Sequence, residues 1–158
     1  MLTRGLQALI PLLGIFALTI GCGVDPTGAN GDDVEFSARV DVMESFPVQL
    51  VGQLTVENTG DDRVTVVFPD GCVALLSAFD VNDGDRPVWT QSVACTAVLV
   101  PVDLGPGERR TFSTPIANAR EILGTELPDG EYLIVVNLRP DGVAIALEVG
   151  TVELAIPR

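Results

Sequence analysis

From Val34 onward the sequence alternates between apolar and polar residues with a period of two, and this pattern limits the fold more than any other feature. Alternation of this kind places every second side chain on one face of an extended chain, so it is typical of half-buried β-strands. The apolar positions of the successive runs are Val34, Phe36, Ala38, Val40 and Val42; Leu50, Leu54 and Val56; Val64, Val66 and Phe68; Phe79 and Val81; Tyr132, Ile134, Val136 and Leu138; residues 143–149; and residues 152–156.

Turn-forming residues separate these runs. The tripeptide Pro-Asp-Gly occurs at 69–71, 128–130 and 140–142, and Pro106-Gly107 suits a type II turn. Proline presets φ, aspartate hydrogen-bonds its own backbone, and glycine adopts positive φ, so each tripeptide has the chemistry of a turn. Short strands at this spacing predict an all-β fold, an Ig-like antiparallel β-sandwich of about seven or eight strands.

One segment departs from the alternation. In STPIANAREILG (113–124), Thr114 is a candidate N-cap, Pro115 stands at the first helical position, and Gly124 ends the segment. The pattern predicts one short helix near 115–123 that packs on one end of the sandwich.

The composition excludes several chemistries. The 158 residues favour a single domain, and they include neither histidine nor lysine. Catalytic triads, Cys-His nucleophiles, imidazole metal sites, Schiff bases and P-loops all need one of these residues. A hydrolase built on a carboxylate pair survives this elimination, but no such pair stands out. We therefore expect a non-enzymatic protein with no cofactor and no metal. The formal net charge of −13 repels phosphate backbones, so we expect no nucleic-acid partner.

The first 21 residues have the organisation of a bacterial export signal, with a positive charge at Arg4 and an apolar stretch over 6–20. LTIGC (18–22) resembles the lipobox of bacterial lipoproteins, in which the cysteine is lipidated and becomes the mature N-terminus. We expect Cys22 to carry the lipid and to anchor the exported protein to the membrane of the bacterial envelope, the outer membrane where the host has one.

The sequence after Cys22 is rich in glycine, proline, asparagine and aspartate, as expected of a flexible tether. The predicted organisation is therefore a signal peptide (1–21), a lipidated cysteine with its tether (22–33) and a β-sandwich domain (34–158). Simple secretion is one alternative. Another is an uncleaved transmembrane anchor over 5–24, because about 20 mostly apolar residues approach the length that spans a bilayer.

Cys72 and Cys95 remain once Cys22 is assigned to the lipid. Export places them in an oxidising compartment, where an even number of thiols favours a structural disulfide. A metal-binding or redox pair is the alternative, but the long separation of the two cysteines and the lack of histidine disfavour it.

Three further features invite a functional interpretation. The acidic run DVNDGD (80–85) fails the EF-hand pattern, because Asp85 and Gln91 stand where glycine and glutamate are required, so a solvated hairpin turn is preferred over a loose calcium site. Trp89 is expected in the core rather than as an exposed binding anchor. Tyr132 resembles a tyrosine corner, in which the hydroxyl ties a loop to the edge of the sandwich.

Four segments, in their order, resemble the BsuPI family, a domain named after an intracellular proteinase inhibitor of Bacillus. They are LTVENTGDDRVTVVFPDGC (54–72), LSAFDVNDGDRPVWTQS (76–92), LGPGERRTF (104–112) and LPDGEYLIVVNL (127–138). The resemblance covers residues 45–140 or so and rests most on Asn58, on Asp80 with Trp89, on Pro-Gly-Glu at 106–108 and on Gly-x-Tyr at 130–132.

The resemblance implies an Ig-like β-sandwich and inhibition of serine proteases. The chain departs from the family in its expected export, in Cys72 and Cys95, and in Pro115-Ile116, which stand where the family often has a tryptophan. No reactive-site motif of the family is carried over to residues of this chain.

Taken together, these patterns predict a non-enzymatic protein-binding domain, a proteinase inhibitor displayed on the cell envelope. Its partner would be a serine protease or an envelope protein. The alternative is an envelope scaffold or assembly lipoprotein whose Ig-like interaction module has no inhibitory activity. The candidate binding residues are Asp83, Gly84, Asp85 and Arg86 in one loop, and Ser92, Val93, Ala94 and Thr96 in a second loop that a disulfide at Cys95 would rigidify.

Overall fold

The structure, a computed structural model, describes residues 33–156. This part of the chain forms ten strands, one α-helix, α1 (Ala119–Leu123), and one 3-10 turn, η1 (Pro140–Gly142). In chain order the strands are β1 (Val34–Met43), β2 (Gln49–Asn58), β3 (Val64–Phe68), β4 (Ala74–Asp80), β5 (Asp83–Thr90), β6 (Val100–Leu104), β7 (Arg109–Ser113), β8 (Ala117–Asn118), β9 (Gly130–Leu138) and β10 (Ile145–Leu154).

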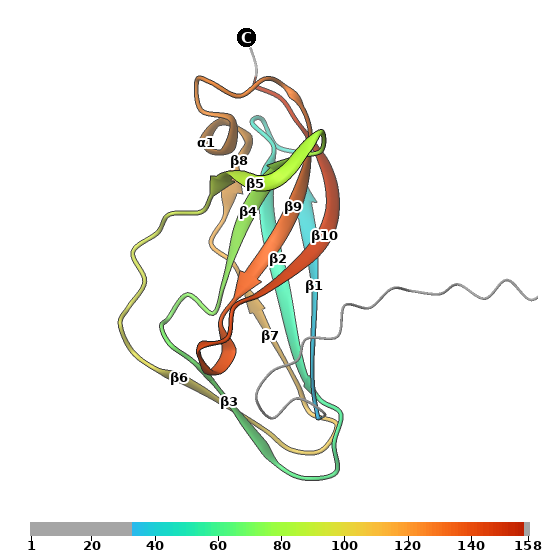
Figure 1. Cartoon of the computed structure of the whole chain (residues 1–158), viewed down its shortest axis with the longest axis vertical. Coiled ribbons are helices and arrows are strands. Elements are labelled where there is room, and N and C mark those ends of the chain that lie inside the picture. The colour runs from blue at the N-terminus through green and yellow to red at the C-terminus, as the bar shows by residue number, and fades with distance from the viewer. Residues whose placement is uncertain (1–32, 157–158) are drawn as a thin grey trace, which may run out of the picture.

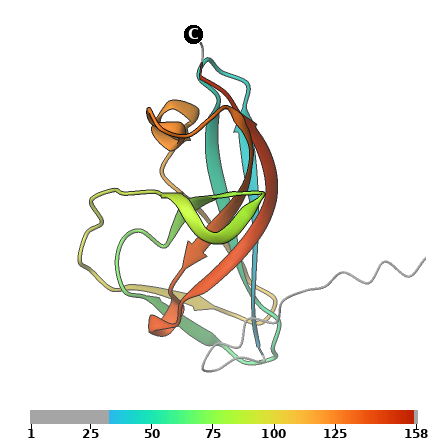
Figure 2. The same cartoon turned by 45° about the horizontal axis from the view of Figure 1, so that its top comes forward.

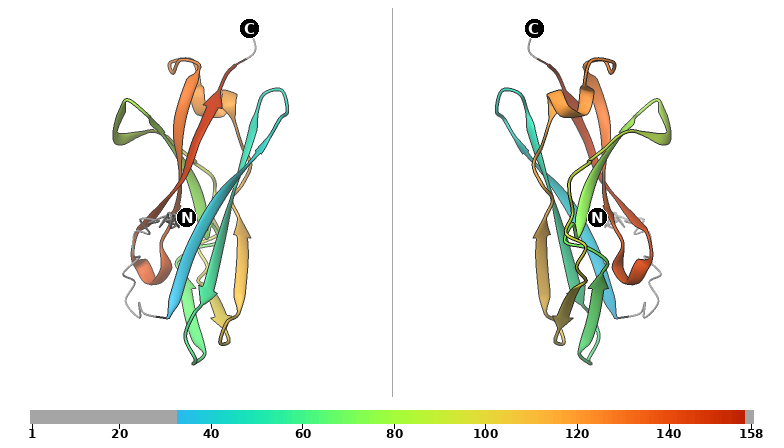
Figure 3. Two further views of the ribbon diagram at one scale, coloured as in Figure 1. Left: turned by 90° about the vertical axis from the view of Figure 1, so that its right-hand side faces the viewer. Right: turned by 90° about the vertical axis from the view of Figure 1, so that its left-hand side faces the viewer.

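The strands form two facing sheets and a two-stranded ribbon (Figure 1). One sheet has the order β1-β2-β7, with β8 pairing with the end of β2, and the other has the order β10-β9-β4-β5. Figure 3 shows these sheets as the two layers of the molecule, and the β3-β6 ribbon lies at one end. All pairings are antiparallel, which confirms the predicted β-sandwich. The strand orders match those of Ig-like domains.

The core lies between the two sheets, where the alternating apolar side chains meet. Burial along β2 follows the sequence pattern, with every second residue buried from Leu50 to Asn58. The largest fully buried side chains are Phe68, Leu50, Leu54, Leu76, Leu104, Leu123, Ile134, Leu154, Val56, Val136 and Asn58. Trp89, expected in the core, is half-buried and packs against the core from its edge.

Gly52 marks a close approach between the two sheets. A Cβ atom there would lie 2.9 Å from Leu76 Cδ2 and 3.1 Å from Val136 Cγ2, and both residues belong to the opposite sheet. The backbone of Gly52 also exchanges hydrogen bonds with Thr114, since its N–H donates to Thr114 Oγ1 and its carbonyl accepts from Thr114 N. A side chain at this position would have to displace buried core atoms.

The short helix is confirmed, but it begins at Ala119 instead of Pro115. Asn118 rather than Thr114 is the N-cap, because its side-chain oxygen accepts a hydrogen bond from Glu121 N. The chain just before the helix is extended as β8, since it pairs with β2 and completes that sheet. Tertiary pairing therefore overrides the helical signal of Thr-Pro.

The two apolar runs at 143–149 and 152–156 belong largely to one strand, β10. Glu148 and Gly150 pair with consecutive residues of β9, so Val149 is an extra residue and forms a β-bulge. Gly150 has φ 114°, a conformation that glycine adopts without strain. The bulge shifts the alternation by one residue, so the apolar residues on both sides of it face the core.

Asn58 ties the turn after β2 to the turn between β6 and β7, and its side chain is fully buried. Its Nδ2 donates to the carbonyls of Asp62 and Leu104 at 2.7 and 3.1 Å, and its Oδ1 accepts from Gly60 N at 3.0 Å. Its own backbone N–H donates to Glu108 O. The side chain therefore satisfies three backbone groups at one end of the sandwich.

The β6–β7 turn carries a second internal support. Glu108 accepts hydrogen bonds from Gly105 N and from the side chain of Arg110. The bond from Gly105, followed by the neighbouring guanidinium of Arg110, lowers the pKa of the Glu108 carboxyl below its ordinary value. Gly107 has φ 68°, in agreement with the turn predicted at Pro106-Gly107.

The predicted tyrosine corner is present at the start of β9. Tyr132 is buried, and its hydroxyl donates to the carbonyl of Pro128, four residues upstream, at 2.7 Å. Burial raises the pKa of the Tyr132 phenol, and the carboxylates of Asp80 and Asp129 raise it further. The folded state thus favours the neutral phenol.

The raised pKa of Tyr132 predicts a loss of stability in alkali. The folded-state pKa of Tyr132 lies above the unfolded value of about 10. The contribution of the neutral phenol to the free energy of unfolding is therefore fully present below about pH 10, and it is lost as the pH rises through the folded-state pKa. Tyr132 is the single tyrosine of the chain, so phenolate absorbance against pH measures it directly. A midpoint at or below that of free tyrosine contradicts the prediction, and Tyr132→Phe is expected to lack this alkaline loss of unfolding free energy.

Candidate protein-binding loop

The connection from β5 to β6 is the longest irregular segment within the described residues. Residues 92–99, called here the braced loop, contain no regular secondary structure, and all of them except Cys95 are exposed. Figures 1 and 2 show this connection standing out to one side of the two sheets. The predicted site residues Ser92, Val93, Ala94 and Thr96 all lie in it.

Gln91 fixes the start of the braced loop. Its backbone N–H donates to Leu76 O, and its side-chain oxygen accepts from Leu76 N at 3.2 Å. Its Nε2 donates to the carbonyl of Pro115 at 2.8 Å, and the residue is only 3% exposed. The structural role of Gln91 has no signal in the local sequence, because its partners lie 15 and 24 residues away along the chain.

The middle of the loop is held by the predicted disulfide between Cys72 and Cys95, with a Cα–Cα distance of 5.3 Å. Beside it, Gly71 N donates to Thr96 O at 2.9 Å. Gly71 packs so closely that a Cβ atom there would collide with Thr96 Oγ1. The loop is therefore tied to the β3–β4 connection both covalently and through the backbone.

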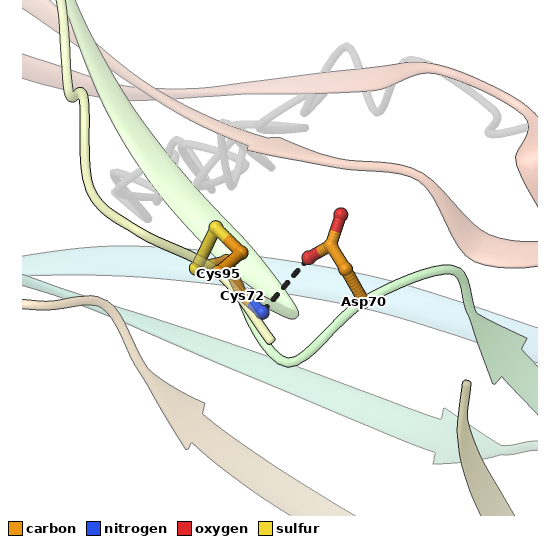
Figure 4. Close-up of side chains that lie close together, drawn as sticks. All are labelled: Asp70, Cys72 and Cys95. Atoms are coloured by element: carbon orange, nitrogen blue, oxygen red, sulfur yellow. Dashed lines mark hydrogen bonds between the residues drawn. A yellow bond between two sulfur atoms is a disulfide. The ribbon is translucent and has the colours of Figure 1, made fainter. Parts of the chain in front are cut away.

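Asp70 completes the surroundings of the disulfide (Figure 4). Its Oδ1 accepts a hydrogen bond from Cys72 N at 2.8 Å, and all three side chains are half-buried. A carboxylate oxygen of Asp70 and the two sulfur atoms lie within 4.8 Å of one another. In the disulfide, both sulfurs are bonded to each other, so neither is a thiolate ligand.

Apolar side chains cover much of the outer part of the braced loop. Val98 is 63% exposed and Leu99 is 65% exposed, and Val93 is exposed as well. Neither arginine nor an acidic residue occurs between 92 and 99. This part of the surface is thus neutral on a strongly acidic chain.

A hollow of about 350 Å³ lies at the foot of the loop, beside the disulfide. It is lined by Gly71, Cys72, Val73, Ala74, Phe112, Ser113, Thr114 and Pro115. None of these side chains is an acid or a base, so this hollow holds no general acid–base pair.

The other predicted loop, which comprises Asp83, Gly84, Asp85 and Arg86, forms the first half of strand β5 instead. Asp83 pairs with Asp80, while the next paired residue of β5 is Pro87. The intervening residues bulge from the ladder and are exposed. The tight turn at residues 81–82 is stabilised by Asp80 Oδ1, which accepts from Asn82 N, so the acidic run forms a hairpin as predicted.

The predicted signal segment, the predicted lipidation site Cys22 and the predicted tether up to residue 32 lie outside the described residues; of the tether only Asp33 is described, and its carbonyl accepts a hydrogen bond from Thr59 N. Within residues 33–156, no helix has the length and apolar character needed to cross a bilayer.

No protein-family model matches the chain, and no curated protein matches it. Among solved structures, a structural-genomics target has a TM-score of 0.41 at 11% identity, covering 80% of this chain and 88% of its own. An alkylpurine DNA glycosylase from Pseudomonas fluorescens has a TM-score of 0.40 at 13% sequence identity, and the match covers 75% of this chain and 30% of the glycosylase chain. A β-glucosidase from Listeria innocua has a TM-score of 0.38 at 18% sequence identity, and the match covers 74% of this chain and 16% of the glucosidase chain. These likenesses assign no activity to the chain.

Proposed function

We propose that this chain is a non-enzymatic protein-binding domain, a proteinase inhibitor displayed on the cell envelope, which contacts its partner through the braced loop. The observation that carries the proposal is that residues 92–99 are almost wholly exposed yet held at their start by Gln91 and in their middle by Cys95. An exposed loop held in one conformation loses little conformational entropy when it binds.

The sequence resemblance to the BsuPI family supports a protease as the partner. A substrate-like loop enters the cleft of a protease, and such complexes bury about 800 Å² on each partner. An unrestrained loop would lose conformational entropy when it binds in the protease cleft, and this loss would weaken binding. The disulfide reduces the loss because it already restrains the loop in the free protein. After a cut on the N-terminal side of Cys95, the disulfide still joins the two halves of the loop.

The composition of the braced loop supports a narrower class of target. Its sequence, SVACTAVL, offers small and aliphatic side chains but no arginine or lysine. Trypsin-like proteases recognise a cationic side chain through an aspartate in the specificity pocket, whereas other serine proteases have small or apolar pockets. We therefore expect inhibition of proteases that cleave after small or apolar residues.

Anchoring at the envelope is the second part of the proposal. It is supported by the lipobox-like residues ending in Cys22, and a disulfide is compatible with an exported protein. A lipid on Cys22 and the tether that follows it would display the domain at the membrane surface.

The test is a titration of the oxidised protein against subtilisin-like, elastase-like, chymotrypsin-like and trypsin-like proteases, following residual activity and the integrity of the chain. We expect stoichiometric loss of activity for proteases with apolar or small pockets and none for the trypsin-like enzyme. Leu99→Ser should weaken inhibition at least about tenfold, equivalent to about 1.4 kcal/mol. Val42→Ser, which replaces an apolar residue that is 45% exposed on β1, is the matched control and should not change it.

Absence of inhibition across the panel, or digestion of the chain as an ordinary substrate, would reject the inhibitor function. Recovery of the chain with envelope proteins by crosslinking would then favour the scaffold alternative. In that case, the same Leu99→Ser and Val42→Ser pair shows whether the braced loop makes the contact.

A further inference from the structure

Asp70, Cys72 and Cys95 form a cluster whose chemistry extends beyond a cross-link (Figure 4). The three potential donor atoms, one carboxylate oxygen and two sulfurs, lie within 4.8 Å of one another. Zinc in proteins binds sulfur at about 2.3 Å and carboxylate oxygen at about 2.1 Å, so tetrahedral ligand atoms stand about 3.8 Å apart or less. Reaching that spacing requires the two sulfurs to separate and the side chains to rotate.

The backbone around the cluster is organised without the help of the disulfide. Gly71 N donates to Thr96 O, and these residues are the immediate neighbours of Cys72 and Cys95. The Asp70 carboxylate is positioned by its hydrogen bond from Cys72 N. Since neither bond involves sulfur, reduction of the disulfide breaks neither of them.

We propose that, when the disulfide is reduced, Asp70, Cys72 and Cys95 bind one thiophilic divalent cation such as zinc. A dithiol reductant supplies two electrons and two protons, so Cys72 and Cys95 become thiols while the dithiol becomes a disulfide. Cation binding releases both thiol protons and forms two metal–sulfur bonds and one metal–oxygen bond. Three protein ligands leave the fourth position to water.

The bound cation takes the place of the cross-link between the braced loop and the β3–β4 connection. The domain then keeps this loop tied down under both oxidising and reducing conditions. This inference concerns the reduced chain and does not depend on whether the oxidised chain inhibits a protease.

The test uses the full chain with Cys22→Ser, so that only Cys72 and Cys95 provide thiols. Cobalt(II) is titrated into the oxidised chain and, without oxygen, into the reduced chain freed of reductant. We expect one cobalt per reduced chain, with thiolate-to-cobalt charge-transfer absorption that zinc abolishes, and no such signal from the oxidised chain. Zinc should also raise the thermal midpoint of the reduced chain.

Asp70→Asn separates the ligand role of the carboxylate from its structural role, because the amide oxygen still accepts the bond from Cys72 N. This variant should bind cobalt at least about tenfold more weakly than the parent chain. Asp103→Asn is the matched control, since the Asp103 carboxylate also accepts one hydrogen bond, from the Thr65 hydroxyl instead of a backbone N–H, but lies outside the cluster. Equal cobalt signals in reduced and oxidised chains, or equal affinity in the parent chain and Asp70→Asn, would overturn the proposal.

Discussion

Asn58→Ala is expected to lower the free energy of unfolding by about 3 kcal/mol, because it leaves one buried and two partly buried backbone groups without their hydrogen-bond partner. The alanine can neither donate to Leu104 O and Asp62 O nor accept from Gly60 N. The Asn58 side chain and its bond to Leu104 O are fully buried, whereas its bonds to Asp62 O and Gly60 N are partly buried. Urea unfolding of the parent chain and the variant, both oxidised, measures the difference.

The matched control for this experiment is Asn82→Ala. Asn82 also lies at a turn and donates from Nδ2 to Asp80, but it is exposed. Its replacement should change the unfolding free energy by about 0.5 kcal/mol or less. Similar losses for the two variants would show that the Asn58 side chain contributes no more than an ordinary turn residue.

Replacing both Cys72 and Cys95 with serine is expected to destabilise the oxidised protein by about 3 kcal/mol. The bond joins residues 23 positions apart, and a closed loop of that size restricts the unfolded chain by about this amount in the chain-entropy model. The sheets themselves should persist, because neither cysteine lies in a strand. Urea unfolding measures the loss, and far-ultraviolet circular dichroism checks that the strands remain.

The slope of the unfolding transition gives an independent check on that explanation. Without the cross-link the unfolded chain expands, so the dependence of unfolding free energy on urea should become steeper. The reduced parent chain with a metal chelator is the control and should match the double serine variant within about 0.5 kcal/mol. An unchanged midpoint in the serine variant would show that the disulfide does not stabilise the domain.

Much of the fold could be predicted because its information is local. β2 and β3 show regular alternation, since one face of each strand meets the core, and β1 and β9 alternate over most of their length. The exceptions are Val42, which is exposed near the end of β1, and Val135, which is buried out of phase on β9. The Pro-Asp-Gly turns have their own chemistry, and at the third of these turns Gly142 has the positive φ, 81°, expected of glycine.

The elements that were placed incorrectly depend on distant partners. The helix starts late because Ala117 and Asn118 pair with β2, more than 60 residues earlier in the chain. β10 was divided in two because a single extra residue, Val149, breaks the alternation without ending the strand. Residues 83–86 carry turn-forming glycine and aspartate, yet they belong to β5, because the pairs Asp80–Asp83 and Phe79–Pro87 hold the strand on both sides of the bulge.

The candidate site was predicted only in part, for the same reason. The count of cysteines and the expected compartment indicated the Cys72–Cys95 bond, which the structure confirms. The anchoring role of Gln91 and the contact between Gly71 and Thr96 could not be predicted, because each joins segments that only the folded sheets bring together.

The disulfide has a consequence for how a cut in the braced loop would be detected. The disulfide closes residues 72–95 into a covalent ring. Residues 92–94 of the braced loop lie within that ring, whereas residues 96–99 lie outside it. Hydrolysis of a peptide bond within 92–94 opens the ring yet leaves one molecule, heavier only by a water. Hydrolysis within 96–99 yields two polypeptides that separate in denaturing electrophoresis without reductant. Gels run with and without reductant therefore identify which half of the loop a protease has cleaved.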